Sequence, residues 1–251
     1  MILLENLWYC AALATEVDTK PMRRIICGIP MVFYRTRVGE PVVLEDRCSH
    51  RQAPLSMGEV IGDEIQCNYH GYVFDRTGAC IHIPHQEGTP RRAAIQSFSA
   101  LERWGLIWIW WGDPAQANDD SVPDLSWTEA ADRRPVYLYY HVNANHQLVA
   151  DNLLDISHAD YLHSKTLGSD SGKKGGARPA KMTMKIRVED DRVNSYRKLE
   201  KVNVGELCRK WGGFTKKVDR VNIQMWEPPN TVHVHLEFMN EENHILINHD
   251  H

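Results

Sequence analysis

The sequence predicts an α+β protein in which an antiparallel β domain, residues 1–118, precedes a second domain, residues 119–251, with a helix and another sheet. Three observations support this prediction. Short apolar runs broken by Gly, Pro and Asp fill the first part, a helical pattern of leucines follows a polar linker, and alternating segments occupy the last part. A chain of 251 residues with 43% hydrophobic content is long enough to bury two modest cores.

The strands expected in the first domain are rich in β-branched and aromatic residues. They span 25–35, 41–46, 64–80 and 105–113. Four tryptophans close to one another should serve mainly core or interface packing. They are Trp104, Trp108, Trp110 and Trp111. The proline-containing polar segment from Asp113 to Asp124 is the expected linker.

The second domain is expected to begin like a strand at 134–142 and to continue as a helix. Leu148, Leu153 and Leu162 mark the helical apolar period. Apolar and polar residues then alternate at period two over 182–202 and 220–239, with a turn-like break in each. This pattern predicts two hairpins of a second sheet.

Charge and composition exclude several classes of protein. The 29 basic and 33 acidic residues give a net charge of -4 without a basic block, so we expect no nucleic-acid partner. The chain has no apolar run long enough for a membrane span and opens without a secretory signal, which predicts a cytoplasmic protein outside the membrane. Disulfides are then the weaker interpretation of the cysteines, and Cys10, Cys27 and Cys208 are expected to be small buried hydrophobes.

Two Cys-His pairs stand out in the first domain. Cys48 and His50 are separated by one residue, and Cys67 and His70 by two, with sixteen residues between the pairs. Two thiolates and two imidazoles suit a two-iron cluster in which the thiolates hold one iron and the imidazoles the other. The alternative is a tetrahedral zinc site, which uses the same ligand types. Zinc sites more often pair Cys with Cys and His with His, so the mixed pairs favour the cluster.

The segments CSHRQAPLSMGEV and CNYHGYVFDRTGAC resemble the C-x-H and C-x-x-H signature of the Rieske oxygenase family. This resemblance implies a [2Fe-2S] cluster held by Cys48, His50, Cys67 and His70. Cys80 matches no ligand position and is expected to be a structural thiol.

A second constellation lies in DNLLDISHADYLH, residues 151–163. Imidazole and carboxylate groups suit a mononuclear iron with open positions. Asp155 and His158 share one face of a helix, but five steps of about 100° place His163 about 140° from His158. We therefore expect a bulge, a kink or a helix end between the two histidines. The alternative is a set of polar side chains on the exposed face of an amphipathic helix.

The same stretch resembles the N-x-x-D-x-x-H-x-x-x-x-H motif of Rieske oxygenase catalytic domains, which have a helix-grip-like fold. The resemblance implies that His158 and His163 bind a mononuclear ferrous iron, that Asp155 bridges this iron to a cluster histidine of a neighbouring subunit, and that Asn152 lies beside the iron. The family's third ligand is a late aspartate, and Asp250 lies in no matching motif. We expect either a further C-terminal segment or a third ligand from elsewhere.

ENLWYCAAL and GIPMVFYRT are similar to segments of vanillate and dicamba O-demethylases. This resemblance implies a homotrimeric terminal oxygenase that takes electrons from a reductase or ferredoxin, ultimately from NAD(P)H, and uses O2 to hydroxylate or oxidatively demethylate a small, often aromatic, acid. The rivals are a Rieske ferredoxin-like electron carrier and a zinc-stabilised binding module.

The glycine- and lysine-rich segment Gly168–Arg178 follows directly on the second constellation. It could serve as a lid in which Lys173, Lys174 or Arg178 attracts a carboxylate. The alternative is a loop whose charges only interact with water.

Overall fold

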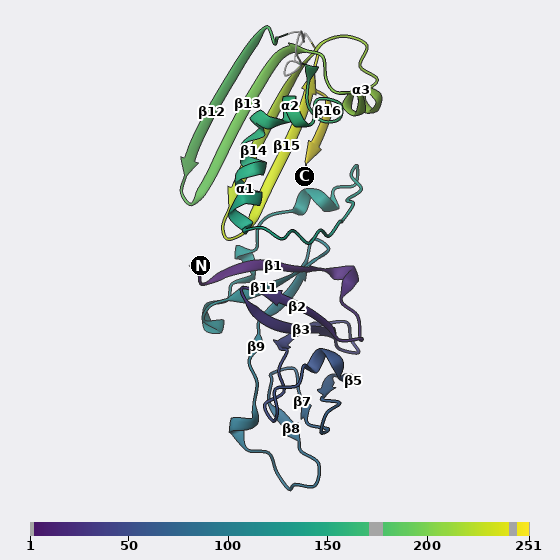
Figure 1. Cartoon of the computed structure of the whole chain (residues 1–251), viewed down its shortest axis with the longest axis vertical. Coiled ribbons are helices and arrows are strands. Elements are labelled where there is room, and N and C mark those ends of the chain that lie inside the picture. Colours follow the sequence, from purple (N-terminus) through teal and green to yellow (C-terminus); the bar gives the residue numbers. More distant parts are fainter. Residues whose placement is uncertain (1–2, 171–177, 241–244, 251) are drawn as a thin grey trace. The chain divides into compact units, whose positions relative to one another are not determined.

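The computed structural model describes residues 3–170, 178–240 and 245–250, the last range by its backbone alone. The chain forms two compact units, Met1–Tyr140 and His141–His251 (Figure 1). Residues 119–140, which the sequence analysis assigned to the second domain, group with the first unit.

Within its described residues, the first unit contains three antiparallel sheets, ordered β1-β11-β10, β2-β3-β4-β9 and β5-β6-β7-β8. Their strands are β1 Leu7–Leu13, β2 Met22–Ile26, β3 Ile29–Arg35, β4 Pro41–Glu45, β5 Glu59–Ile61, β6 Glu64–Gln66, β7 Val73–Phe74, β8 Cys80–His82, β9 Ser97–Phe98, β10 Ala100–Arg103 and β11 Leu106–Trp111. Short 3-10 turns lie between the strands or after the last of them: η1 Ala14–Glu16, η2 Leu55–Met57, η3 Arg91–Ala93, η4 Pro114–Gln116, η5 Asp119–Ser121 and η6 Ser126–Glu129.

The expected strand at 25–35 is a hairpin, because Cys27 and Gly28 both take positive φ, 53° and 80°, and turn the chain between β2 and β3. The segments at 41–46, 64–80 and 105–113 each contain the expected strands. Strand β1 was not predicted, since its alanines lack the β-branched character of a strand; it pairs with β11.

The tryptophan prediction is confirmed. Trp108 and Trp110 are 1% and 5% exposed and pack with Trp8 in one core, with Trp104 at its margin. A separate core holds Leu55, which is fully buried, together with the Cys48 and Cys67 thiols. The two loops that carry the Cys-His pairs are therefore anchored in packed apolar side chains.

The strand expected at 134–142 is wrong. These residues have no strand partner, and Val136 and Tyr140 are exposed by 82% and 76%. An alternating or aromatic pattern forms a strand only where a neighbouring edge accepts its backbone hydrogen bonds, and in the described part of the unit these residues pair with no such edge.

The second unit is an antiparallel sheet in the order β12-β13-β14-β15-β16, so both predicted hairpins are confirmed. The strands are β12 Lys181–Glu189, β13 Arg192–Val202, β14 Val218–Glu227, β15 Thr231–Met239 and β16 Ile245–Asp250, and the helices are α1 His146–Leu154, η7 Ile156–His158, α2 Ala159–Leu162 and α3 Glu206–Gly212. Helix α1 packs on β14 and β15 (Figure 1). This is the α+β architecture that the sequence predicts.

The strand register fixes which side chains share a face of this sheet. Leu199 of β13 lies opposite Arg220 of β14, Arg197 opposite Asn222, and Ser195 opposite Gln224. All six side chains are buried or nearly so, which makes this the covered face.

Several expectations fall on residues beyond this description. Residues 171–177, with Lys173 and Lys174 of the suggested lid, lie outside the described residues, as does the side chain of Asp250. A search of the described helices for one long and apolar enough to cross a membrane found none.

Candidate metal centres

The two loops that carry the Cys-His pairs are the same backbone turn used twice. The Cys48 N–H donates to the carbonyl of Ala53 at 2.9 Å, and the Cys67 N–H donates to that of Tyr72 at 2.8 Å, in each case five residues on. The residue at the fourth position, Gln52 or Gly71, donates its N–H back to the cysteine carbonyl and has positive φ. The two turns therefore hold the two cysteines at equivalent backbone positions.

The turns bring thiols and imidazoles together as two pairs. Cys48 and Cys67 are 2% and 1% exposed, and their side chains are in hydrogen-bonding contact. The rings of His50 and His70 are exposed, with centroids 4.6 Å apart and planes at 69°. A buried thiol pair beside an exposed imidazole pair is the donor arrangement of a cluster with one thiolate-held and one imidazole-held iron.

Neighbouring side chains hold the turns in place. The Tyr72 ring stacks on that of His50 at 4.8 Å and 5°. Behind the first turn, the buried carboxylate of Asp46 accepts hydrogen bonds from the N–H and hydroxyl of Ser56 at 2.6 and 2.7 Å and pairs with Arg23 at 3.0 Å. The sequence analysis did not identify these supporting residues.

The electrostatics around the thiols suit a metal-bound thiolate. Burial raises the pKa of Cys48, and the neighbouring Cys67 acts in the same direction, whereas hydrogen bonds from the N–H groups of His50 and Arg51 lower it. N–H groups aimed at sulfur stabilise negative charge there, and a bound iron would replace the proton that burial otherwise favours. Weakened solvation beside the turn and the nearby charges of His70 and Arg51 lower the pKa of His50, which favours the neutral imidazole that a metal requires.

The remaining cysteines match the prediction in part, because Cys80 and Cys208 are buried whereas Cys10 and Cys27 are only half-buried. No cysteine forms a disulfide, and all six lie in described parts of the chain. Burial raises the pKa of Cys10 and of Cys27 to about 11, and also raises those of Cys80 and Cys208. Such thiols stay protonated and unreactive.

In the second unit the helical segment is interrupted at Asp155, before His158, and ends between His158 and His163. Helix α1 ends at Leu154, Asp155 leaves helical geometry with φ −91° and ψ 88°, and η7 ends at His158. Helix α2 has only four residues and ends at Leu162, directly before His163. The two rings lie 5.4 Å apart at 73°, so the expected helix end between the histidines is confirmed.

One hydrogen bond orients His158. Its Nδ1 lies 2.7 Å from the backbone oxygen of Asp155. Because a carbonyl oxygen only accepts, Nδ1 must carry the proton, and Nε2 is left with a lone pair for a metal. The Asp155 carboxylate is exposed and accepts the N–H of Ser157 at 2.9 Å, and hydrogen bonding to Ser157 holds its pKa below the usual range.

The two histidines are not joined by a third ligand in the part of the chain that is described. No group of three or more His, Cys, Asp or Glu side chains converges there on a point suited to one metal ion. Asn152 lies on the last turn of α1 and is exposed. The two imidazoles are thus brought together, Asp155 contacts His158 through its backbone carbonyl, and Asn152 is adjacent along the helix.

A buried ionic cluster that the sequence analysis did not identify fixes the turn between the histidines. Asp160 accepts the N–H and hydroxyl of Ser169 at 3.0 and 2.8 Å and the Arg197 guanidinium at 2.6 Å, with Arg220 at 3.9 Å. Asp160 and Arg220 are 3% and 1% exposed. Arg197 also donates to the carbonyl of Ile156 at 3.4 Å, so it contacts the chain on both sides of His158.

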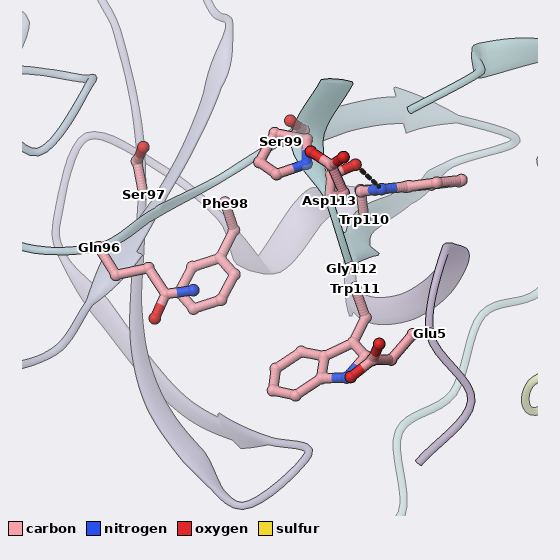
Figure 2. Close-up of a pocket in the computed structure, with 10 residues that line it drawn as sticks. Glu5, Gln96, Ser97, Phe98, Ser99, Trp110, Trp111, Gly112 and Asp113 are labelled. Carbon is pink, nitrogen blue, oxygen red and sulfur yellow. Dashed lines mark hydrogen bonds between the residues drawn. The ribbon is translucent and has the colours of Figure 1, made fainter. Parts of the chain in front are cut away.

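The structure contains one cavity beside the Asp160 cluster and another in the first unit. One of about 360 Å³ is lined by Asp160 and Tyr161 of α2, Arg197 and residues 178–182. The other, of about 290 Å³, lies in the first unit beside Trp110 and Trp111, and Figure 2 shows the Trp110 indole N–H directed at Asp113. None of the predicted ligand residues lines either cavity.

Comparison with protein families matches both units. Residues 7–99 match the family described as Rieske [2Fe-2S] domain, and residues 142–251 match the vanillate O-demethylase oxygenase C-terminal domain.

Individual proteins agree with these matches. The chain is 40% identical over 236 residues to a putative toluene-4-sulfonate monooxygenase system iron-sulfur subunit of Comamonas testosteroni, covering 91% of this chain and 65% of the relative. It is 36% identical to the dicamba O-demethylase oxygenase component of Stenotrophomonas maltophilia, covering 95% and 68%. A crystal structure of dicamba monooxygenase bound to 3,6-dichlorosalicylic acid superposes with a TM-score of 0.89 at 33% identity, covering 98% and 71%. The chain therefore spans about two thirds of the length of these relatives.

Proposed function

We propose that this chain acts as the terminal oxygenase of a multicomponent system. The chain belongs to the Rieske non-haem iron oxygenase family, beside the vanillate and dicamba O-demethylase oxygenase components. It would hydroxylate or oxidatively demethylate a small, aromatic, acidic substrate with O2. The observation that carries this proposal is the coexistence of two donor sets, the twin Cys-His turns and the broken helix with two facing imidazoles.

The first donor set fits a [2Fe-2S] cluster held by Cys48, Cys67, His50 and His70. Bound there, the cluster would pass single electrons. The protein shields the thiolate side of such a cluster from solvent, because both thiols are buried. Electrons would therefore enter or leave on the side of the exposed imidazoles. The N–H groups directed at Cys48 and the neutral ligands His50 and His70 both favour the reduced cluster.

The second donor set fits a mononuclear ferrous iron at His158 and His163, and the iron would supply O2 activation. Asp155 fixes the tautomer and direction of His158 through its carbonyl, which leaves Nε2 available. The Asp160 cluster fixes the backbone on which both histidines are carried. Asn152 is proposed to lie beside the iron, and the third ligand is not among the described side chains.

We also propose that Asp155 carries electrons across a subunit boundary. Its carboxylate is exposed and ionised, and His50 and His70 are exposed in the other unit. A contact between such surfaces on two copies fits a head-to-tail homotrimer, which places a cluster of one subunit beside the iron of the next. A reductase or ferredoxin would supply the electrons, ultimately from NAD(P)H, in the cytoplasm.

Metal analysis of anaerobically purified protein tests the assignment. We expect about three iron atoms per chain, two in the cluster and one mononuclear, with Rieske-type absorption and electron paramagnetic resonance spectra. A His158→Ala/His163→Ala double variant should keep the cluster spectra and lose only the mononuclear iron. Cys48→Ser should do the reverse, losing the cluster while the second unit still binds ferrous iron.

The outcomes separate the rival functions. Cluster iron alone, with no ferrous iron bound on titration, would identify an electron carrier. Zinc in place of iron would identify a zinc-stabilised module. The match of residues 142–251 to an oxygenase C-terminal domain supports the oxygenase over the carrier.

The bridging role is tested by Asp155→Asn. An asparagine still accepts the Ser157 N–H and leaves the carbonyl bond to His158 intact, so both metals should stay bound. Turnover should fall by about 100-fold or more, because the charge that links the two centres is gone. Asp151→Asn, an exposed acid one turn earlier, is the matched control, and equal turnover in the two variants would remove the bridging role.

A further inference from the structure

The cavity of about 290 Å³ in the first unit has aromatic walls and an acidic rim. Phe98 and Trp110 are buried in its wall, and the half-buried Trp111 indole lies nearly parallel to the Phe98 ring, with centroids 6.4 Å apart and planes at 9° (Figure 2). Glu5 and Asp113 line the same cavity, and both are exposed. Its volume is at the lower end of the range for ligand sites, which suits one small molecule or a single side chain.

The charges that line this cavity are all negative. None of the ten lining residues is a lysine, an arginine or a histidine, whereas Glu5 and Asp113 are carboxylic acids. The Asp113 carboxylate accepts the N–H of Ala115 at 3.0 Å and the Gln116 amide at 3.2 Å, and these hydrogen bonds hold its pKa below the usual range. Asp113 is therefore ionised at neutral pH, and neither donor carries a charge that would neutralise it.

Backbone contacts hold the rim of the cavity in place before any ligand binds. The Asn6 N–H donates to the Trp111 carbonyl at 2.6 Å, and the Asn6 side-chain oxygen accepts the Asp113 N–H at 2.9 Å. This approach requires glycine at position 112, where φ is +142° and a Cβ would overlap Oδ1 of Asn6. The segments that carry Glu5 and Asp113 are thus joined, and a preformed site loses little conformational entropy on binding.

A guanidinium group matches these features together. Its plane stacks on an aromatic face, its positive charge is attracted by an indole, and its N–H groups donate to carboxylates. An apolar stem behind it would lie against Phe98 and Trp111. An anion would meet only like charge in this cavity, and a neutral ligand would gain little from the two carboxylates.

We propose that this cavity binds an alkylguanidinium, with Glu5 and Asp113 accepting its N–H groups and Trp111 lying against its plane. The group is carried either by a small organic cation or by an arginine side chain of a partner protein, because both present the same chemistry. None of the lining residues belongs to either metal donor set. The inference therefore goes beyond the proposed oxygenase function and does not depend on it.

Fluorine NMR of the purified full chain labelled with 5-fluorotryptophan tests the proposal. The chain has eight tryptophans, and the signal that disappears in Trp111→Phe identifies Trp111. Titration with n-butylguanidinium should shift this signal to saturation, whereas n-butylurea, an uncharged group of the same shape, should bind about tenfold more weakly or less. An acetylated and amidated Gly-Arg-Gly peptide separates the two sources. Tighter binding of the peptide assigns the site to a protein partner, and tighter binding of the free cation assigns it to a small molecule.

Glu5→Gln and Asp113→Asn remove the charges while keeping the shapes of the side chains. An asparagine still accepts the Ala115 N–H, so the 3-10 turn that follows stays capped. Each single variant should weaken binding of n-butylguanidinium by about threefold to fivefold, and the double variant by about tenfold or more. Glu59→Gln removes an exposed acid of β5 that does not line the cavity, and it should bind the probe as the natural protein does.

A Trp111 signal that neither cation shifts would overturn the inference, as would equal affinity for n-butylguanidinium and n-butylurea. Natural affinity in the Glu5→Gln/Asp113→Asn double variant would also overturn it, because the two carboxylates would then have no part in binding. Both substitutions are on the surface, so melting temperatures should stay within about 3 °C of that of the natural protein. If a variant melts lower, the comparison of the two butyl probes on the natural protein still decides.

Discussion

Replacing Asp160 with asparagine removes the only carboxylate from a buried cluster that also holds two guanidiniums. The acid is 3% exposed, accepts two hydrogen bonds from Ser169 and pairs with Arg197 at 2.6 Å. Removing one partner of a buried ion pair costs about 3–5 kcal/mol. Asparagine still accepts hydrogen bonds, so we expect about 3 kcal/mol.

For a unit of about 110 residues, each kcal/mol lowers the melting temperature by about 4 °C. Asp160→Asn should therefore melt about 12 °C lower in differential scanning calorimetry. Urea unfolding followed by circular dichroism should show the corresponding shift in midpoint with an unchanged m value.

The matched control is Asp219→Asn. Asp219 pairs with Lys198 at 2.9 Å on the opposite face of the same sheet, where both side chains are partly exposed. Its loss should cost only about 1 kcal/mol. A loss for Asp160→Asn no larger than that of the control would refute the reasoning, because the cluster would then contribute no more than a surface pair.

Three further predictions concern Asp160 in the second unit and Gly71 and Leu55 in the first. Burial would raise the pKa of Asp160, but hydrogen bonds from Ser169 and the charge of Arg197 outweigh it and hold this pKa below its usual range. The carboxylate therefore stabilises the fold above the unfolded-state pKa of about 4, and this stabilisation is lost as the pH falls through the lower folded-state pKa. The difference in unfolding free energy between the natural protein and Asp160→Asn should close in acid, and a constant difference down to about pH 2 would contradict this. Gly71→Ala should lower the free energy of unfolding by about 1–3 kcal/mol and speed loss of the cluster absorbance, because φ is +73° and a Cβ would lie 3.0 Å from Pro84. Gly28→Ala, at φ +80° with no atom within 4 Å of the added Cβ, should lower it by less. Equal losses in the two variants would show that the contact with Pro84 is irrelevant. Leu55→Ala should lower the free energy of unfolding of the first unit by about 2–5 kcal/mol in urea titrations, and a loss under 1 kcal/mol would mean that this core does not support the cluster loops.

The sequence predicted the elements whose signals are local. The two Cys-His pairs are defined by short spacings, and a hairpin needs only neighbouring residues to form. The helix end between His158 and His163 followed from geometry, because a regular helix would direct the two rings apart.

The buried face of β14 could not be predicted in this way. Alternation along 220–225 predicts that Val221, Ile223 and Met225 face the core and that the polar residues between them face water. The structure buries Val221 as expected, but it also buries Arg220 and Gln224 to 1% and 0% exposure, while Ile223 is only half-buried. Periodicity gives the two faces of a strand but not which of them a helix covers, and that choice depends on long-range packing.

The opening strand and Asp160 were missed for a related reason. Strand β1 forms because β11 offers it an edge, and the two are about a hundred residues apart in sequence. Asp160 acquires its role from arginines on β13 and β14, which a local motif does not contain.

Asp155 occupies a joint between two rigid pieces, with α1 ending just before it and η7 starting just after. Its carboxylate faces outward, while its carbonyl holds the His158 ring at 2.7 Å. A surface that binds the Asp155 carboxylate would therefore also act on the residue whose carbonyl orients the His158 ring. In the proposed homotrimer, subunit assembly would therefore also affect the alignment of the proposed ligand His158, and an isolated chain would hold that imidazole less firmly than an assembled one.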